Sequence, residues 1–171
     1  MPPAAVKTVK DLIFYQYAKI IASSAKISGH GFIMSTMKKL SSGEIKMSAA
    51  LRELKMQMTC KEHCCEYCDA TEDLSWDHLI PRTKNGPDIA ENHVLACRKC
   101  NSSKGCKGLY EWYGLARKDV LPRLVAGKYL KLLYEFHESR GTLHATDLNG
   151  DGQLDVLDLE VLSSDLATPN I

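Results

Sequence analysis

The sequence predicts an α+β protein that is mostly helical. Apolar residues recur at helical spacing near the start of the chain and again after residue 114, whereas residues 75–80 form a short apolar segment between two Cys-x-x-Cys pairs. The chain has 171 residues, of which 44% are hydrophobic and 25% charged, the composition of a globular protein. We therefore expect one compact domain with additions.

Two helices are predicted in the N-terminal region. The first covers about residues 5–25 and presents an apolar stripe that we assign to the core. The Ser/Gly-rich segment 28–31 interrupts the pattern, and Ser41 followed by Glu44 resembles a capping box, which predicts that the second helix begins there. A helix-turn-helix is an alternative here, although no segment identifies a recognition helix. The stripes consist of Val6, Val9, Leu12, Ile13, Tyr17, Ile20 and Ile21, then Met47, Leu51, Leu54 and Met58.

A third helical region follows residue 114. Pro122 suits the first turn of a helix, and Gly141 suits its end. Between them an apolar face continues through Leu124, Leu130, Leu133 and Phe136.

Charge is distributed unevenly along the chain. Residues 1–64 contain ten Lys/Arg and four Asp/Glu, residues 65–140 contain twelve and eleven, and residues 141–171 contain none and six. The basic front could contact nucleic acid phosphates or could be a solvated helix surface, and composition leaves both possibilities open.

The first 25 residues are too polar for a signal-peptide core or a membrane span, because Lys10, Asp11, Gln16 and Lys19 interrupt the apolar positions. We expect a cytoplasmic protein without a membrane partner. In that compartment, the seven cysteines favour metal ligation over disulfide bonds.

The two Cys-x-x-Cys pairs are separated by 28 residues. Two such turns can place four thiolates around one zinc ion, and four thiolates leave no open position for substrate, so we predict a structural zinc site. Cys64 is an alternative to Cys65, and the neighbouring His63 could compete as a ligand, although the two-residue spacing favours Cys65. We expect Cys60, Cys64 and Cys106 to be free, buried thiols. The predicted ligands are Cys65, Cys68, Cys97 and Cys100.

The segment between and just after these pairs contains polar residues that suit catalysis. Asp77-His78 lies in the apolar segment, Asn92 precedes the second pair, and Asn101 and Lys104 follow it. These elements, in this order over residues 65–105, resemble the HNH nuclease family in its four-cysteine form. Separately, each residue has a structural interpretation, such as a helix cap for Asn101.

The resemblance implies a ββα-metal core. It places Asp77-His78 on the first strand, a loop at about residues 82–91, a second strand at 93–96, and a helix that opens near Cys97. The whole chain would then comprise a basic helical region (1–64), the nuclease core with its four-cysteine zinc site (65–114), a packing helix region (115–141) and an acidic tail (142–171).

The resemblance also implies roles for individual residues. His78 would be the general base, and Asp77 and Asn101 would hold one Mg²⁺ or Mn²⁺ ion through oxygens that suit hard cations. Asn92 would brace the loop and orient the histidine. Lys104 would contact phosphate or pair with an acid. We expect His93, next to Asn92, to be a strand-surface residue, with phosphate binding as the alternative.

The acidic tail has oxygen-bearing side chains at the spacing of an EF-hand or dockerin calcium loop. Gly152 would permit the sharp turn, and Asp158 stands where such loops usually have Glu. The alternative is an Asp/Gly-rich turn that leads into a helix at residues 156–162. The predicted calcium ligands are Asp147, Asn149, Asp151, Gln153, Asp155 and Asp158.

The function predicted from these features is metal-dependent endonuclease activity on DNA. A homodimer would suit cleavage of both strands. The alternative is a non-catalytic four-cysteine zinc module that binds nucleic acid or protein, and a third possibility is a calcium-dependent assembly protein.

Overall fold

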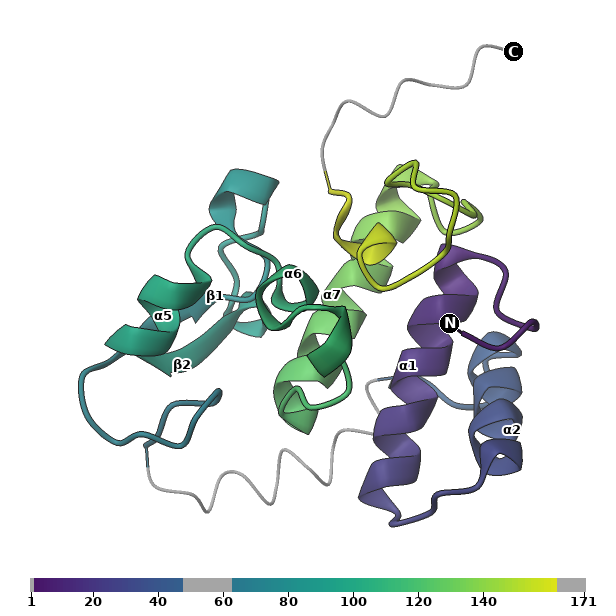
Figure 1. The fold of residues 1–171 in the computed structure, drawn as a ribbon, viewed down its shortest axis with the longest axis horizontal. Helices are drawn as coiled ribbons and strands as arrows, with labels where there is room; N and C mark the ends of the chain where they lie inside the picture. Colours follow the sequence, from purple (N-terminus) through teal and green to yellow (C-terminus); the bar gives the residue numbers. More distant parts are fainter. Residues whose placement is uncertain (1, 48–62, 163–171) are drawn as a thin grey trace.

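The computed structural model describes residues 2–47 and 63–162 (Figure 1). It has the predicted α+β class, with helices around a small two-stranded antiparallel sheet. Within these described ranges, no helix is both long and apolar enough to span a bilayer. The elements are α1 (Val9–Ser24), α2 (His30–Ser41), β1 (Leu74–His78), η1 (Arg82–Lys84), η2 (Ala90–Asn92), β2 (His93–Cys97), α5 (Arg98–Lys104), α6 (Leu109–Tyr113), η3 (Leu115–Arg117), α7 (Arg123–Arg140) and η4 (Asp158–Glu160).

Helix α1 is the first predicted helix, and a capping box sets its start. The Thr8 hydroxyl accepts a hydrogen bond from the Asp11 amide at 3.2 Å, and the Asp11 carboxylate accepts one from the Thr8 amide. The helix packs against α2 and α7. Most of its apolar side chains are buried, in agreement with the stripe found in the sequence.

Helix α2 corrects the sequence prediction for the following segment. The helix begins at His30, directly after Gly29 as N-cap, whereas the sequence pattern predicts that residues 28–31 interrupt helical structure. Glycine is among the residues favoured at the N-cap, where the backbone is still extended. Ser41 ends α2 instead of capping a new helix, and the Glu44 carboxylate lies 3.2 Å from Lys39 Nζ. Leu51, Leu54 and Met58 of the predicted second stripe lie outside the described residues.

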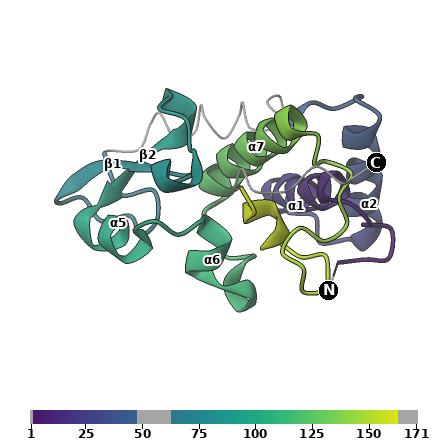
Figure 2. The same ribbon diagram turned by 90° about the horizontal axis from the view of Figure 1, so that it is seen from above.

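Helix α7 lies between the sheet and the pair α1 and α2, as both views show (Figures 1 and 2). Pro122 is its N-cap, and Gly141 ends it with φ of 70°, a left-handed conformation that glycine adopts without strain. Both bounds agree with the sequence prediction. The helix contacts α1 on one side and η2 of the sheet region on the other.

The sheet and α5 form the predicted ββα arrangement. Strands β1 and β2 pair antiparallel, with Asp77 opposite Val94 and His78 opposite His93, and α5 packs against both strands. The connecting loop contains η1 and η2. Gly86 is required in this loop because a Cβ atom there would lie 1.8 Å from the Ile80 carbonyl oxygen.

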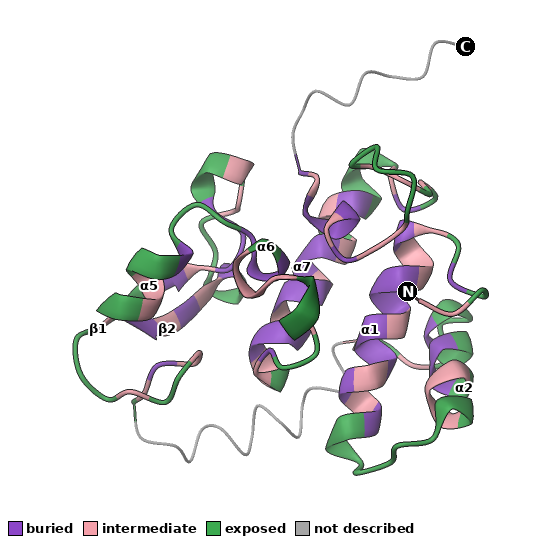
Figure 3. Ribbon diagram, in the orientation of Figure 1, coloured by how far each residue is buried: buried purple, intermediate pink, exposed green. Residues whose placement is uncertain are grey.

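The acidic tail packs back onto the helices. The amides of Val9 and Lys10 donate to the carbonyls of Ala145 and Leu143, both at 2.9 Å. After residue 155 the tail contains the 3₁₀ turn η4 and no α-helix at 156–162, which corrects the alternative interpretation of this segment. The buried faces of α1, α7 and η4 meet in one hydrophobic core (Figure 3).

Candidate functional site

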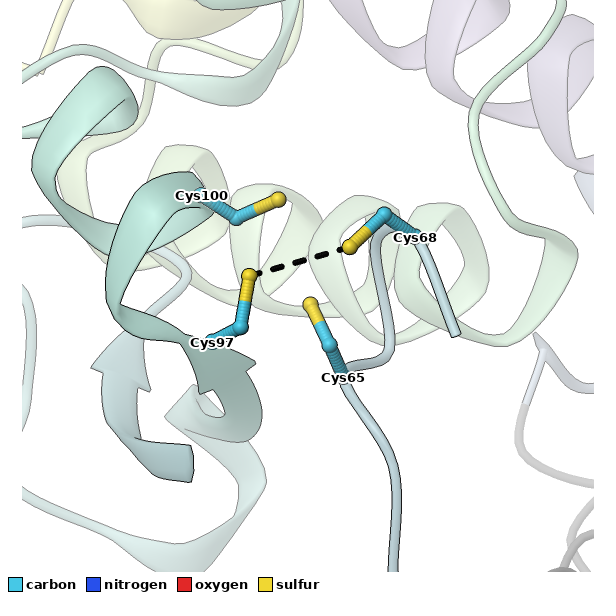
Figure 4. A group of neighbouring side chains, drawn as sticks. All are labelled: Cys65, Cys68, Cys97 and Cys100. Atoms are coloured by element: carbon cyan, nitrogen blue, oxygen red, sulfur yellow. Dashed lines mark hydrogen bonds between the residues drawn. The ribbon is translucent and has the colours of Figure 1, made fainter. Parts of the chain in front are cut away.

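Four cysteine side chains converge between the β2–α5 junction and the turn that precedes β1 (Figure 4). Their sulfur atoms all lie within 4.8 Å of one another, and Sγ of Cys68 is 3.7 Å from Sγ of Cys97. Sulfurs around a tetrahedral zinc ion, with bonds of about 2.3 Å, lie about 3.8 Å apart. The group Cys65, Cys68, Cys97 and Cys100 could therefore hold zinc.

Backbone hydrogen bonds shape both cysteine turns, and in the second turn they favour one thiolate. The Cys65 amide donates to the Ala70 carbonyl at 2.7 Å, and the Asp69 amide donates to the Cys65 carbonyl at 2.9 Å, which closes the first turn. In the second turn, a backbone hydrogen bond from Cys100 is the largest influence that lowers the pKa of Cys97, to about 7. A lower pKa favours the thiolate, the form that binds metal.

The remaining cysteines have different environments. Cys64 is half-buried and Cys106 is exposed, so the expectation that Cys106 is buried is wrong. Cys60 lies outside the described residues. Within the part of the chain that the structure describes, neither Cys64 nor His63 joins the four-cysteine group.

Asn92 fixes the loop between the strands. Its side chain accepts a hydrogen bond from the Ile80 amide at 2.8 Å and donates to the carbonyls of Ile80 and Pro87 at 3.0 and 2.9 Å. The residue is fully buried. These contacts hold the backbone on both sides of the loop, close to His78.

Asp77 points from β1 toward α5 and is buried. Its carboxylate accepts a hydrogen bond from the Tyr67 hydroxyl at 2.6 Å and lies 3.2 Å from Lys104 Nζ. Burial, followed by the charge of Asp77, raises the pKa of Tyr67, so the phenol stays protonated and donates. Burial also lowers the pKa of Lys104, against the opposing effect of Asp77.

Asn101 lies on the same side of the sheet as Asp77. From α5 its Nδ2 donates to the hydroxyl of Ser75 at 3.1 Å, and Ser75 precedes Asp77 by two residues on β1. Alternate strand residues point to the same face. The Asp77 carboxylate and the Asn101 side-chain amide therefore lie on one face of β1, and carboxylate and amide oxygens are ligands that fit a hard divalent cation.

His78 points to the opposite face of β1, where it meets two residues that the sequence analysis does not assign to the site. Its Nε2 lies 3.0 Å from Nε2 of His93, and the two rings meet edge to face. The Asp88 carboxylate lies 3.4 Å from His78 Nε2 and 3.1 Å from His93 Nε2. The sequence predicts a strand-surface role for His93, with phosphate binding as the alternative, and no contact with His78. The signal that could have revealed it is the hairpin register, which places residues 78 and 93 opposite each other.

The predicted calcium residues of the tail are engaged mainly with backbone amides. Asp147 accepts hydrogen bonds from the amides of Gly150 and Gly152, and the buried Asp158 accepts them from Leu148, Asn149 and Asp155. Among the described residues, the tail carboxylates do not form a group close enough to share one ion. The tail turn is thus stabilised by its own side chains.

Comparison with known proteins agrees with this geometry over one part of the chain. Residues 65–107 match the family model described as HNH endonuclease. No curated protein and no solved structure matches the chain significantly. The matched segment contains the four-cysteine group, both strands and α5, and the HNH family commonly includes nucleases.

Proposed function

We propose that this protein is a metal-dependent endonuclease that hydrolyses phosphodiester bonds in DNA. The observation that carries the proposal is the division of roles across β1 within the segment that matches the HNH family. The His78 imidazole lies on one face, and the Asp77 carboxylate and the Asn101 side-chain amide lie on the other.

His78 is the proposed general base. The side chain is partly accessible, with 24% of its surface exposed, at the end of β1. A neutral imidazole can remove a proton from water near neutral pH, and the resulting hydroxide would attack phosphorus. Cleavage would leave a 5′ phosphate and a 3′ hydroxyl.

Asp77 and Asn101 are the proposed ligands of one Mg²⁺ or Mn²⁺ ion. When bound, such an ion supplies charge stabilisation to the pentavalent phosphorane and to the departing 3′ oxygen. Lys104 already lies 3.2 Å from the Asp77 carboxylate, so it would share this carboxylate with the ion. In the proposal, Lys104 covers the buried side of the Asp77 carboxylate and fixes its orientation.

Two further ions belong to the proposal. A zinc ion at the four cysteines would be structural, because four thiolates complete its coordination.

Calcium in the tail is supported only by the spacing of Asp147, Asn149, Asp151, Gln153, Asp155 and Asp158. Loss of a calcium-induced thermal shift in Asp151→Ala, with Mg²⁺-dependent cleavage retained, is the expected result if the tail binds calcium independently of the site. A calcium-induced thermal shift in Asp151→Ala equal to that of the parent would exclude calcium binding at this loop.

The test of the main proposal is incubation of supercoiled plasmid with Mg²⁺, Mn²⁺, Ca²⁺ or chelator, with nicked and linear products measured separately. Cleavage should require Mg²⁺ or Mn²⁺. His78→Ala should lose at least about 10²-fold in rate, the size of a positioned base. His30→Ala, at an exposed position on α2, is the matched control. Equal rates for His78→Ala and the parent would exclude the proposed mechanism. Linear product at early times would support the proposed homodimer.

One observation favours a second candidate function, a zinc module that binds nucleic acid without cleaving it. The Asp77 carboxylate is already paired with a buried lysine, an arrangement that stabilises the fold without a divalent ion. Such a module would shift DNA in a mobility assay and give no product with any of these metals.

A further inference from the structure

Three metal-ligating side chains gather where the β1–β2 loop meets the sheet. His78 ends β1, His93 begins β2, and Asp88 lies in the loop between them. Their three nearest ligand atoms, two imidazole Nε2 atoms and one carboxylate Oδ1, are 3.0, 3.1 and 3.4 Å apart.

One of these distances matches the edge of a coordination tetrahedron, and the other two are slightly shorter. With bonds of about 2.0–2.2 Å to imidazole nitrogen and carboxylate oxygen, ligand atoms around zinc lie about 3.3–3.5 Å apart. An ion at the centre of the three atoms would need only small adjustments of the side chains. The Asp88 side chain is 72% exposed, which leaves the fourth position open to solvent.

The backbone that carries these ligands is fixed. His78 and His93 are direct partners in the antiparallel register. Asn92, next to His93, binds the carbonyl of Pro87, which is next to Asp88. The two histidines would therefore require little ordering when they bind an ion, and Asp88 is held nearby by the braced loop.

The site differs from the proposed magnesium site in place and in chemistry. Asp77 and Asn101 lie on the α5 side of β1, whereas His78 and His93 lie on the other side. Two imidazoles and one carboxylate suit a divalent transition ion of the zinc type, because imidazole is a poor ligand for Mg²⁺.

We propose that His78, Asp88 and His93 bind one divalent transition-metal ion, and that the bound ion blocks the nuclease. An ion coordinated by Nε2 of His78 occupies the lone pair that would accept the proton from water. Zinc-type ions would therefore have opposite effects in one chain, since they stabilise the fold at the four cysteines and inhibit at the histidines. Inhibition rests on the proposed function, whereas metal binding does not.

Binding is tested with cobalt on protein that already holds one zinc per chain. Co²⁺ titration, followed by visible absorption and calorimetry, should show one further site without a thiolate charge-transfer band. Asp88→Asn and His93→Asn should each weaken Co²⁺ binding by at least about tenfold, the lower end of the loss caused by removing even an outer partner of a metal site. Glu91→Gln, an exposed acid in the same loop, should bind as the parent does. No further ion in the parent, or equal affinity in Asp88→Asn, would overturn the site.

Inhibition is tested by adding Zn²⁺ to cleavage reactions with saturating Mg²⁺. The Zn²⁺ midpoint should match the binding midpoint, and Asp88→Asn should raise both midpoints together. Cleavage that persists when the site is full would overturn the inhibitory role while leaving the metal site intact. If the parent does not cleave DNA at all, the proposed function and the inhibitory role both fail. The cobalt titration would still show whether His78, Asp88 and His93 bind an ion.

Discussion

The helical body and the four-cysteine end (residues 65–104) of this molecule are packed in different ways. In the body, large apolar side chains from α1 and α7, such as Ile13, Tyr17, Tyr129 and Leu133, are completely buried. At the four-cysteine end, the only separate apolar cluster among the described residues consists of Cys65, Ala96 and Cys97. Hydrophobic burial therefore stabilises the body more than it stabilises the four-cysteine end, where a bound zinc ion would add the stability that the small cluster lacks.

This difference suits the proposed nuclease site. Catalytic groups need to be partly exposed and polar, so a segment that carries them cannot bury much apolar surface. Leu79, Ile80 and Val94 still join the main core, which anchors the base of the hairpin to the body. The proposed site thus lies between the packed helical body and the four cysteines.

The largest expected effect comes from removing zinc. Cys97→Ser, or a strong chelator, should unfold residues 65–104 because a structural zinc ion contributes about 10–16 kcal/mol of binding free energy to folding. Hydrogen exchange should show rapid exchange in β1, β2 and α5 and continued protection in the centres of α1 and α7. Cys106→Ser is the control, since Cys106 is exposed and lies outside the four-cysteine group. If β2 stays protected from hydrogen exchange after zinc is removed, the fold of residues 65–104 does not depend on zinc.

Next in size is the buried ion pair of the site. Lys104→Met leaves the Asp77 carboxylate buried without its cation, which should lower the free energy of unfolding by about 3–5 kcal/mol. Urea denaturation measures this change. Lys84→Met, which breaks the more exposed pair with Glu111, should cost less than about 1 kcal/mol. Equal losses in the two variants would show that the Asp77–Lys104 pair is not a stabilising element of the site.

The parts that can be predicted from sequence have local signals. Helices α1 and α7 follow from apolar spacing, and Pro122 and Gly141 mark the ends of α7. The four-cysteine group follows from ligand spacing, and the ββα arrangement follows from the family resemblance. In each case the information lies within a short stretch of chain.

The parts that sequence reasoning misses depend on how distant segments meet. Helix α2 starts after a Ser/Gly segment because its packing against α1 outweighs the weak helix preference of glycine. Asp88 and His93 join His78 only through the strand register and the loop fixed by Asn92. The sequence predicts that Lys104 contacts phosphate or pairs with an acid, but which acid it meets depends on how α5 packs on the strands.

A smaller effect is expected from the loop brace. Asn92→Ala leaves the buried Ile80 amide without its acceptor, which should cost about 1–3 kcal/mol. Cleavage should fall because Asn92 fixes the backbone close to His78, and cobalt affinity should fall because the same loop carries Asp88. Asn92→Asp should restore acceptance from the Ile80 amide but not donation to the Pro87 carbonyl, so its cobalt affinity should stay reduced. Full cobalt affinity in Asn92→Ala would show that the loop holds its shape without this side chain.

The smallest expected effect is a pH dependence within the helical body. His137 is buried where α7 meets the tail, and its Nε2 lies 3.1 Å from the Leu159 carbonyl oxygen, to which it donates. Burial lowers the pKa of His137, with the Leu159 carbonyl and Asp158 acting in the opposite direction. The neutral ring is therefore favoured in the folded state, while the unfolded chain takes up the proton more readily. The stability contributed by His137 should be present above the ordinary histidine pKa of about 6.5 and be lost as the pH falls through the lowered folded pKa.

Glu160 lies in η4, next to the Leu159 that His137 contacts. Its contribution to stability changes with pH in the opposite direction, so it allows a matched test. Burial raises the pKa of its carboxyl, despite hydrogen bonds from Tyr129 and two backbone amides. The contribution of Glu160 is therefore complete below the ordinary glutamate pKa and is lost as the pH rises through the raised folded pKa. Melting temperatures between pH 5 and pH 8 should show a weaker loss toward acid in His137→Gln than in the parent, and a stronger one in Glu160→Gln. If both variants keep the parent's pH profile, the pH dependence of the melting temperature arises from groups other than His137 and Glu160.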